Sequence, residues 1–215
     1  MDDDFIQLIQ SLIIPPLITI LLEEGIITEE SSILEFKNAM SKLNLHKEIS
    51  KLKFSIDISD SYKDAIENAI NNEQKDVAIT LTGILFEQIV NKFYYDVLLS
   101  YLNFSKTEYD ACMKGAAVKD KLTWLYKLTT NESIDSNLIS DIHKVCSARN
   151  FYVHYKPHTW YIDDMSDQAY EMEHIDIKNL LPLVEQLEVI FSNYIGRIFP
   201  TTQKAREMFE KYNDS

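Results

Sequence analysis

The chain has 215 residues, 46% of them hydrophobic, so it is long enough to bury a sizeable core. Its net charge of -13 argues against the broad basic surface with which many proteins bind nucleic acid, although one or two phosphates can still be held in a local pocket. With only 4 Gly and 5 Pro, a turn-rich β fold is disfavoured, and we expect an all-α protein.

The acidic start of the chain, residues 2–4, is the opposite of the basic start of a signal peptide. The apolar run 12–22 is too short to span a bilayer and is interrupted by Pro15 and Pro16. The two cysteines, Cys112 and Cys146, lack the spacing of a zinc site and fit a reducing compartment as small buried side chains. We therefore expect a cytoplasmic protein that does not associate with membranes.

Residues 1–58 are predicted to form an N-terminal helical extension. Within it, residues 5–24 indicate two short helices broken at Pro15-Pro16. They serve either as an anchor for a membrane or partner or, as their length favours, as elements that pack on the main bundle. A further helix is predicted to open at residues 28–30, where two glutamates follow a threonine, and residues 45–58 are expected to connect it to the rest.

Residues 59–199 are predicted to form the main helical bundle. A helix capped by Ser59 or Asp60 runs to about Asn71, and three longer stretches show a 3.6-residue apolar period, namely 74–103, 134–156 and 177–199. Pro182 fits the first turn of the last of these. Residues 200–215 are expected to form a short helix, capped by Thr201, and a tail.

Two charged segments each allow two interpretations. The most basic part of the chain, within 105–130, either guides an RNA backbone or is a solvated helix face, which the pattern favours; its lysines are Lys114, Lys119, Lys121 and Lys127. The acidic run 163–176, with His174, is either a metal site or a solvated loop. Its spacing matches no calcium or zinc motif, which favours the loop.

The stretch 147–157, SARNFYVHYKP, carries the most specific pattern. On a helix from about Ile134, one apolar stripe contains Leu138, Ile142, Val145, Cys146, Tyr152 and Val153. Arg149 falls in the middle of this stripe. A guanidinium on an apolar face is costly unless something pairs with it, so the core, a partner or an anionic ligand must meet Arg149 there.

His154 lies five residues after Arg149, about 140° away around the same helix. Asn150 lies on the side of His154, four residues earlier. Pro157 disfavours helical geometry at Lys156, which places His154 in the last turn, where the helix dipole favours an imidazolium. Because one straight helix points Arg149 and His154 apart, they would converge on a ligand most easily where two copies of the helix meet.

This pattern of an Arg, a polar residue and a His after four intervening residues resembles the HEPN family (higher eukaryote and prokaryote nucleotide-binding), over roughly residues 60–199. The resemblance implies a HEPN-like helical bundle, a homodimer, and a metal-independent endoribonuclease of the kind found among toxins and phage-defence proteins. It implies Arg149, Asn150 and His154 as catalytic residues. Glu87 looks like the acidic residue of many HEPN helices; it either pairs with Arg149 or frames the site, or it is a rim carboxylate facing water.

The residues themselves suit the same chemistry. In RNA cleavage without a metal the ribose 2′-OH is the nucleophile, so the protein must supply a group that moves protons and a cation that stabilises the phosphorane. His154 suits the first task and Arg149 the second. Tyr155, Lys156 and His158 are possible supporting residues, and no cofactor or metal is expected. Some family members carry a Tyr two residues after the His as a target of antitoxin modification; Lys156 stands there, so that control is in question.

A second hypothesis is a non-catalytic HEPN-like helical module that binds a protein partner or a nucleotide. The acidic composition and the extension 1–58 favour it. The expected partners are thus an RNA substrate, a second copy of the chain and, in the toxin interpretation, an antitoxin or regulatory protein.

Overall fold

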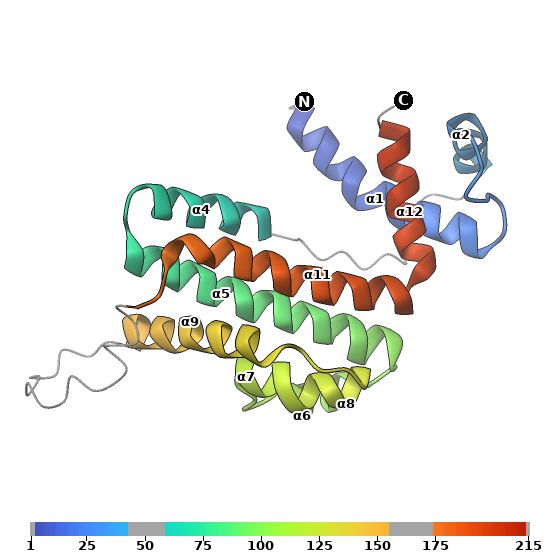
Figure 1. Ribbon diagram of the computed structural model, residues 1–215. Coiled ribbons are helices and arrows are strands. Elements are labelled where there is room, and N and C mark those ends of the chain that lie inside the picture. Colours follow the sequence, from blue (N-terminus) through green and yellow to red (C-terminus); the bar gives the residue numbers. More distant parts are fainter. Residues whose placement is uncertain (1–2, 43–58, 155–173, 214–215) are drawn as a thin grey trace, which may run out of the picture. The chain divides into compact units, whose positions relative to one another are not determined.

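The computed structural model describes residues 3–42, 59–154 and 174–213, and all regular elements in these ranges are helical (Figure 1). The all-α prediction is therefore confirmed for this part of the chain. The chain forms two compact units. One consists of residues 57–193, and the other joins residues 1–56 with residues 194–215.

The unit of residues 57–193 is organised around one long helix, α5, which packs against α4 and α9. Its elements are α4 (Ser59–Asn71), α5 (Lys75–Tyr94), the π-helix η1 (Tyr95–Tyr101), α6 (Lys106–Met113), α7 (Val118–Asp120), the π-helix η2 (Lys121–Leu125), α8 (Tyr126–Thr130), α9 (Ser136–His154) and the 3-10 turn η4 (Ile177–Asn179). The helix α11 (Leu180–Ile198) begins in this unit and continues into the other.

Aromatic packing joins α5, α8 and α11 in the core of this unit. The rings of Phe93 and Phe191 stack with their centroids 4.0 Å apart, and the ring of Tyr126 lies against both. The apolar periods of 74–103, 134–156 and 177–199 thus predict the long helices correctly to within a few residues. Pro182 lies in the first turn of α11, where its missing N–H is harmless.

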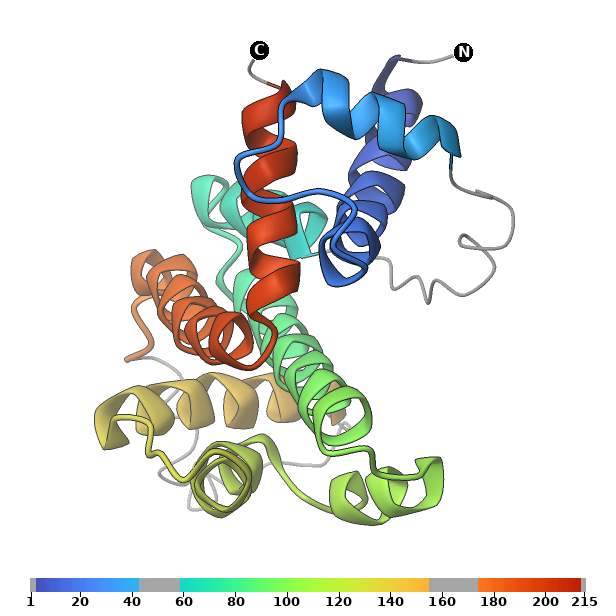
Figure 2. The same ribbon diagram turned by 90° about the vertical axis from the view of Figure 1, so that its right-hand side faces the viewer.

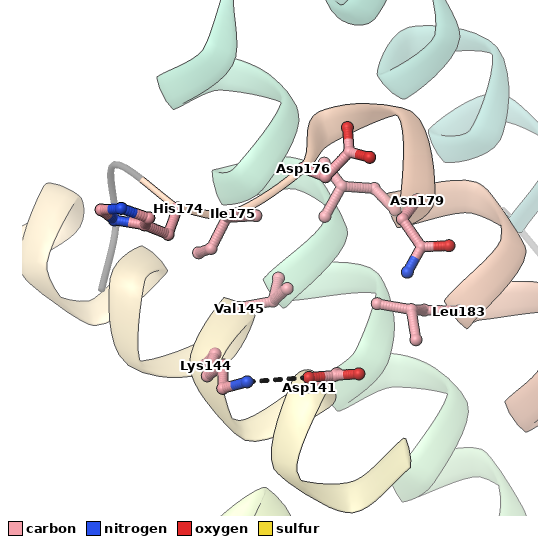
Figure 3. Close-up of a pocket in the computed structure, with 9 residues that line it drawn as sticks. Asp141, Lys144, Val145, His174, Ile175, Asp176, Asn179 and Leu183 are labelled. Carbon is pink, nitrogen blue, oxygen red and sulfur yellow. Dashed lines mark hydrogen bonds and ion pairs between the residues drawn. The ribbon is translucent and has the colours of Figure 1, made fainter. Parts of the chain in front are cut away.

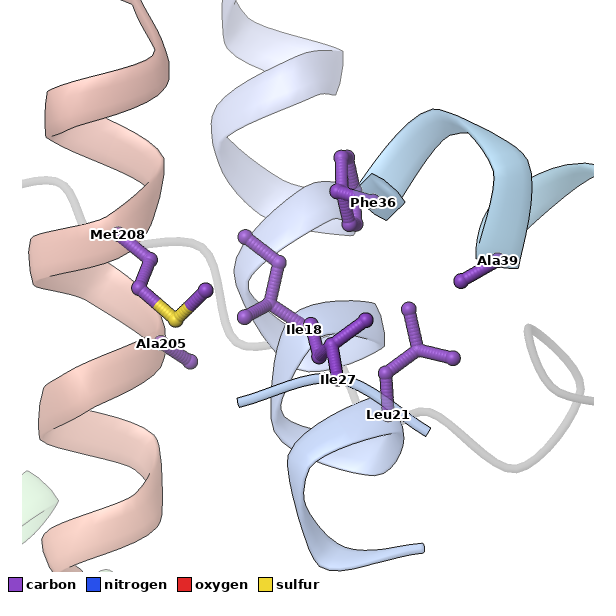
Figure 4. Close-up of a cluster of buried hydrophobic side chains, with 7 residues drawn as sticks. All are labelled: Ile18, Leu21, Ile27, Phe36, Ala39, Ala205 and Met208. Atoms are coloured by element: carbon purple, nitrogen blue, oxygen red, sulfur yellow. The ribbon is translucent and has the colours of Figure 1, made fainter. Parts of the chain in front are cut away.

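The two ends of the chain build the other unit. Its helices are α1 (Asp3–Glu23), α2 (Ile33–Lys42) and α12 (Pro200–Asn213), and α1 packs along α12 (Figure 2). Seven buried side chains from these helices and the α1–α2 loop form its core: Ile18, Leu21, Ile27, Phe36, Ala39, Ala205 and Met208 (Figure 4). The Tyr212 ring stacks on Phe36 at 5.5 Å, and its hydroxyl donates to the carbonyl oxygen of Ser31 at 2.7 Å.

Two predictions for the first 58 residues were wrong in detail. Pro15 and Pro16 lie inside one continuous helix, α1, instead of separating two. The helix continues because Ile18 and Leu21, which follow the prolines, are fully buried in the apolar core, and this burial outweighs the lost backbone hydrogen bonds. The Thr19 hydroxyl also donates to the Pro15 carbonyl oxygen at 3.0 Å.

The next helix, α2, begins at Ile33 and not at residues 28–30. Ser32 and Glu35 form a capping box before it. The Glu35 carboxylate accepts from the Ser32 amide at 2.7 Å, and the Ser32 hydroxyl accepts from the Glu35 amide at 3.3 Å. These hydrogen bonds satisfy the free donors of the first turn, which explains the later start.

The last helix, α12, has 14 residues and starts at Pro200, so Thr201 is not its cap. The predicted boundaries at 58/59 and 199/200 remain a prediction, but the structure adds that the two segments outside them pack together. Among the helices of the described residues, none has the combination of length and apolar composition that crossing a bilayer requires.

Candidate functional site around Arg149

Arg149 lies on the face of α9 that packs against α5, as the sequence pattern indicated. The stripe residues Leu138, Ile142, Val145 and Cys146 are buried. The Arg149 side chain is only 12% exposed, so its charge lies within the packed face. Nearer the end of α9 the apolar stripe is open to solvent: Tyr152 is half-buried, and Val153 is 53% exposed.

Gly83, in the middle of α5, makes room for this arginine. A Cβ atom at position 83 would lie 2.8 Å from the Cβ of Arg149 and 3.1 Å from its Cγ. Any residue other than glycine would therefore push the two helices or the arginine stem apart. A glycine inside a helix costs roughly 0.5–1 kcal/mol relative to alanine, so the close approach of Arg149 is built into α5 at a cost in stability.

Glu87, one turn after Gly83, meets the charge of Arg149. Its Oε1 forms an ion pair with the arginine Nη2, while the Glu87 side chain remains 45% exposed. The structure therefore shows that Glu87 pairs with Arg149, which was one of the interpretations of this residue. The pair extends from the buried guanidinium to a carboxylate at the surface.

One edge of the Arg149 guanidinium has no hydrogen bond. Its Nε and Nη2 are both buried, and neither has a hydrogen-bond partner among the described residues, because the contact with Glu87 is an ion pair without hydrogen-bond geometry. The N–H groups of Nε and Nη2 point in parallel, and such an edge binds a carboxylate or phosphate with two bonds. Buried polar groups are nearly always bonded, so this edge requires an explanation.

A second cation, Lys121, belongs to the same region, and sequence reasoning missed it. The basic segment was predicted to be a solvated face, and Lys114, Lys119 and Lys127 are indeed exposed. Lys121 is only 9% exposed, and its Nζ donates to Asn91 Oδ1 at 2.9 Å. The prediction was wrong for this lysine because Lys121 lies on the buried side of its segment with Val118 and Leu125, where Asn91 of α5 accepts a hydrogen bond from its ammonium group.

Cys146 lies within electrostatic reach of the Arg149–Glu87 pair. Burial raises the pKa of the Cys146 thiol to about 12; the negative charge of Glu87 adds to this rise, and the positive charge of Arg149 opposes it. The thiol is therefore protonated at neutral pH and is not a nucleophile. This agrees with its expected role as a small buried side chain, whereas Cys112 is only half-buried.

The structure describes only some of the remaining predicted site residues. Asn150 is exposed on α9, and His154 is the last described residue of that helix, so its predicted place in the final turn stays a prediction. The His154 side chain, and Tyr155, Lys156 and His158 altogether, lie outside the described residues. So do residues 163–173 of the acidic run, whose end is formed by His174 and Asp176.

A cavity of about 440 Å³ opens between α9 and the start of α11 (Figure 3). Val145, Leu180 and Leu183 give it an apolar floor, while the Asp141–Lys144 ion pair, at 3.0 Å, and Asn179 supply polar groups. The described residues that line it do not include Arg149 or Glu87. Within the described residues, no three His, Cys, Asp or Glu side chains are grouped so that they could hold a metal ion.

No protein-family model matches this chain, and no curated protein or solved structure matches it either. The interpretation of the site therefore depends on the chemistry and geometry of its own residues.

Proposed function

We propose that the protein is a metal-independent endoribonuclease of the HEPN type, acting as a homodimer and serving as a toxin or phage-defence effector. The single observation that carries this proposal is the buried edge of Arg149, whose Nε and Nη2 have no hydrogen-bond partner among the described residues. A phosphodiester would supply two oxygens to these two N–H groups.

The packing around Arg149 supports binding in preference to a purely structural role. If the arginine only served the core, an apolar side chain over an alanine would fill the same space without a buried charge. Instead α5 has Gly83 beneath the arginine stem and Glu87 beside its charge. The half-exposed Glu87 can turn to solvent and leave the guanidinium to an incoming phosphate.

The proposed reaction is transfer within the RNA strand. The 2′-oxygen attacks the adjacent phosphorus, the bond from phosphorus to the 5′-oxygen breaks, and a 2′,3′-cyclic phosphate forms. His154 takes the proton of the 2′-OH and returns a proton to the leaving 5′-oxygen, and Arg149 stabilises the negative charge on the phosphorane oxygens. Water then opens the cyclic phosphate to a 3′-phosphate.

The direct test is to incubate the purified protein with structured RNA in the presence and absence of EDTA. We expect cleavage in both, with cyclic phosphate or 3′-phosphate ends. Arg149→Ala should lower the rate about 10²–10³-fold and His154→Ala about 10²–10⁴-fold, as loss of a charge-stabilising or proton-transferring group does. Arg149→Lys, which keeps the charge but loses the two-donor edge, is the matched variant and should also be slow.

Activity that disappears in EDTA, or that survives His154→Ala, would contradict the mechanism. Binding of RNA or of a nucleotide without any cleavage would favour the alternative, a non-catalytic helical module. Circular dichroism of each variant shows whether a loss of activity reflects the missing side chain or a loss of fold.

A further inference from the structure

Lys121 differs from the other lysines of its segment in being held inside the protein. Its neighbours Lys119 and Lys127 are exposed, whereas Lys121 retains 9% of its accessible surface. Lysine is rarely buried unless its ammonium group has partners. The position of Lys121 is therefore specific, and its partners indicate its role.

The backbone and the side chain of Lys121 are both fixed by α5. The Tyr94 hydroxyl donates to the Lys121 carbonyl oxygen at 2.5 Å, which ties the first residue of η2 to the end of α5. The ammonium group donates to Asn91 Oδ1 at 2.9 Å. Burial lowers the pKa of Lys121, and the negative charge of Glu87 acts in the opposite direction.

Glu87 thus lies within reach of two cations that come from different elements. It forms the ion pair with Arg149 of α9 and acts electrostatically on Lys121 of η2. Gly83, Glu87 and Asn91 are spaced four residues apart on α5, so one stripe of that helix gives space to the arginine stem, a carboxylate to the guanidinium of Arg149 and an amide oxygen to Lys121. Two cations and one carboxylate leave a single net positive charge, which one phosphodiester would neutralise.

We propose that Lys121 is a phosphate-binding residue of the Arg149 site, and that Lys121 and Arg149 together receive one phosphodiester group of single-stranded RNA as Glu87 turns away. This inference rests on the proposed function for its substrate class. It adds a residue from outside the Arg–His motif and assigns Glu87 the role of pairing with Arg149 in the absence of RNA.

The test measures binding separately from cleavage, with a fluorescent single-stranded RNA oligonucleotide whose 2′-hydroxyls are all methylated, so that it cannot be cut by 2′-OH attack. Fluorescence anisotropy gives Kd over a series of salt concentrations. Lys121→Gln can still donate to Asn91 but has no charge. Each phosphate contact of a single strand contributes about −0.7 to the slope of log K against log salt. Lys121→Gln should therefore weaken binding and make this slope shallower by about 0.7. Lys121→Arg should largely restore both, and the exposed Lys127→Gln is the matched control.

The outcomes separate the two proposals. A folded Lys121→Gln protein with the affinity and salt slope of wild type, or one that differs no more than Lys127→Gln, overturns the role of Lys121 even if wild type cleaves RNA. A wild-type protein that binds the oligonucleotide through Lys121 but cuts no RNA overturns the nuclease and leaves the phosphate site standing. If wild type does not bind the oligonucleotide, the inference fails. Should Lys121→Gln not fold, Lys121→Met and Lys121→Arg are compared in its place.

Discussion

The helix pairs α5–α9 and α1–α12 solve the same packing problem with different chemistry. Between α1, α2 and α12, the contact is apolar, with Ile18 and Leu21 fully buried and Met208 nearly so. Between α5 and α9, the Arg149 stem passes over Gly83. The buried Nε and Nη2 atoms of the Arg149 guanidinium form no hydrogen bond with the described residues. A buried polar group without a hydrogen bond costs about 1–3 kcal/mol, and the ion pair of Nη2 with Glu87 offsets part of that cost. The difference teaches that the α5–α9 contact, unlike the α1–α12 contact, includes a buried cation paired with a carboxylate.

The largest expected effect comes from mixing two inactive variants, and it depends on the proposed nuclease. If each active site takes Arg149 from one subunit and His154 from the other, a heterodimer of Arg149→Ala with His154→Ala keeps one complete site. Unfolding and refolding the two variants together should then raise RNA cleavage at least 10²-fold above either variant refolded alone, because one site regains both groups.

The control for this experiment is native mass spectrometry of tagged subunits, which shows whether heterodimers formed. Heterodimers without any gain in cleavage would rule out a site shared between subunits. A protein that sediments as a monomer at micromolar concentration would contradict the homodimer itself.

The next effect is on the apolar pair. Leu21→Ala removes a fully buried side chain from the core of α1, α2 and α12 and should lower the free energy of unfolding by about 2–5 kcal/mol. Chemical denaturation followed by circular dichroism measures this. Since Leu21 belongs to the core of the other compact unit, we expect oligonucleotide binding by the folded protein to stay the same, and a loss of binding at full helicity would contradict this expectation.

Gly83→Ala tests the close crossing of α5 and α9. The added Cβ would lie 2.8 Å from the Cβ of Arg149, so we expect a loss of about 1–3 kcal/mol, although alanine is the better helix former. In an Arg149→Gly background, which lacks both crowded atoms, the same change should be neutral or stabilising. Gly196→Ala in α11 is the matched control, because the nearest atoms there are 3.8 Å away on Gln203; it should stabilise slightly. Equal effects at positions 83 and 196 would refute the crowding.

The smallest expected effect concerns an ion pair whose two charged groups also form a hydrogen bond. Lys63 of α4 donates to Glu188 of α11 at 2.7 Å, with both side chains 29% exposed. Burial lowers the pKa of Lys63, but the hydrogen bond and charge of Glu188 outweigh it and raise the pKa above its usual value. The pair's contribution is therefore complete below the usual lysine pKa and is lost as pH rises through the folded-state pKa.

Glu188→Gln should accordingly destabilise by less than about 1 kcal/mol at pH 7. The difference in melting temperature between wild type and Glu188→Gln should become smaller as the pH is raised above about 10.5, the usual lysine pKa. A difference in melting temperature that grows with pH would contradict the raised pKa of Lys63. The Lys63–Glu188 pair thus shows how much an ordinary ion pair between two helices contributes to stability, as a reference for the Arg149–Glu87 pair.

Much of the fold could be predicted because it depends on local pattern. The apolar periods gave the long helices, and Pro182 marked the first turn of α11. The apolar neighbours of Arg149 at helical spacing predict that it lies in an apolar stripe, and the structure adds that this part of the stripe is buried. Two predictions failed where distant packing overrides local preference: α1 continues through Pro15-Pro16, and Lys121 is buried.

The sequence by itself determined that the chain is helical and that the Arg149 guanidinium, which lies on an apolar face, needs a partner. Both conclusions follow from the spacing of residues along one helix. Only the tertiary structure decided what meets Arg149. Gly83 and Glu87 meet Arg149 from 66 and 62 positions earlier in the chain, and Lys121 reaches Asn91 from 30 positions later; the sequence offered the Glu87 pairing as one of the interpretations but did not select it. They come together because α5 packs against α9 and Tyr94 ties η2 to the end of α5.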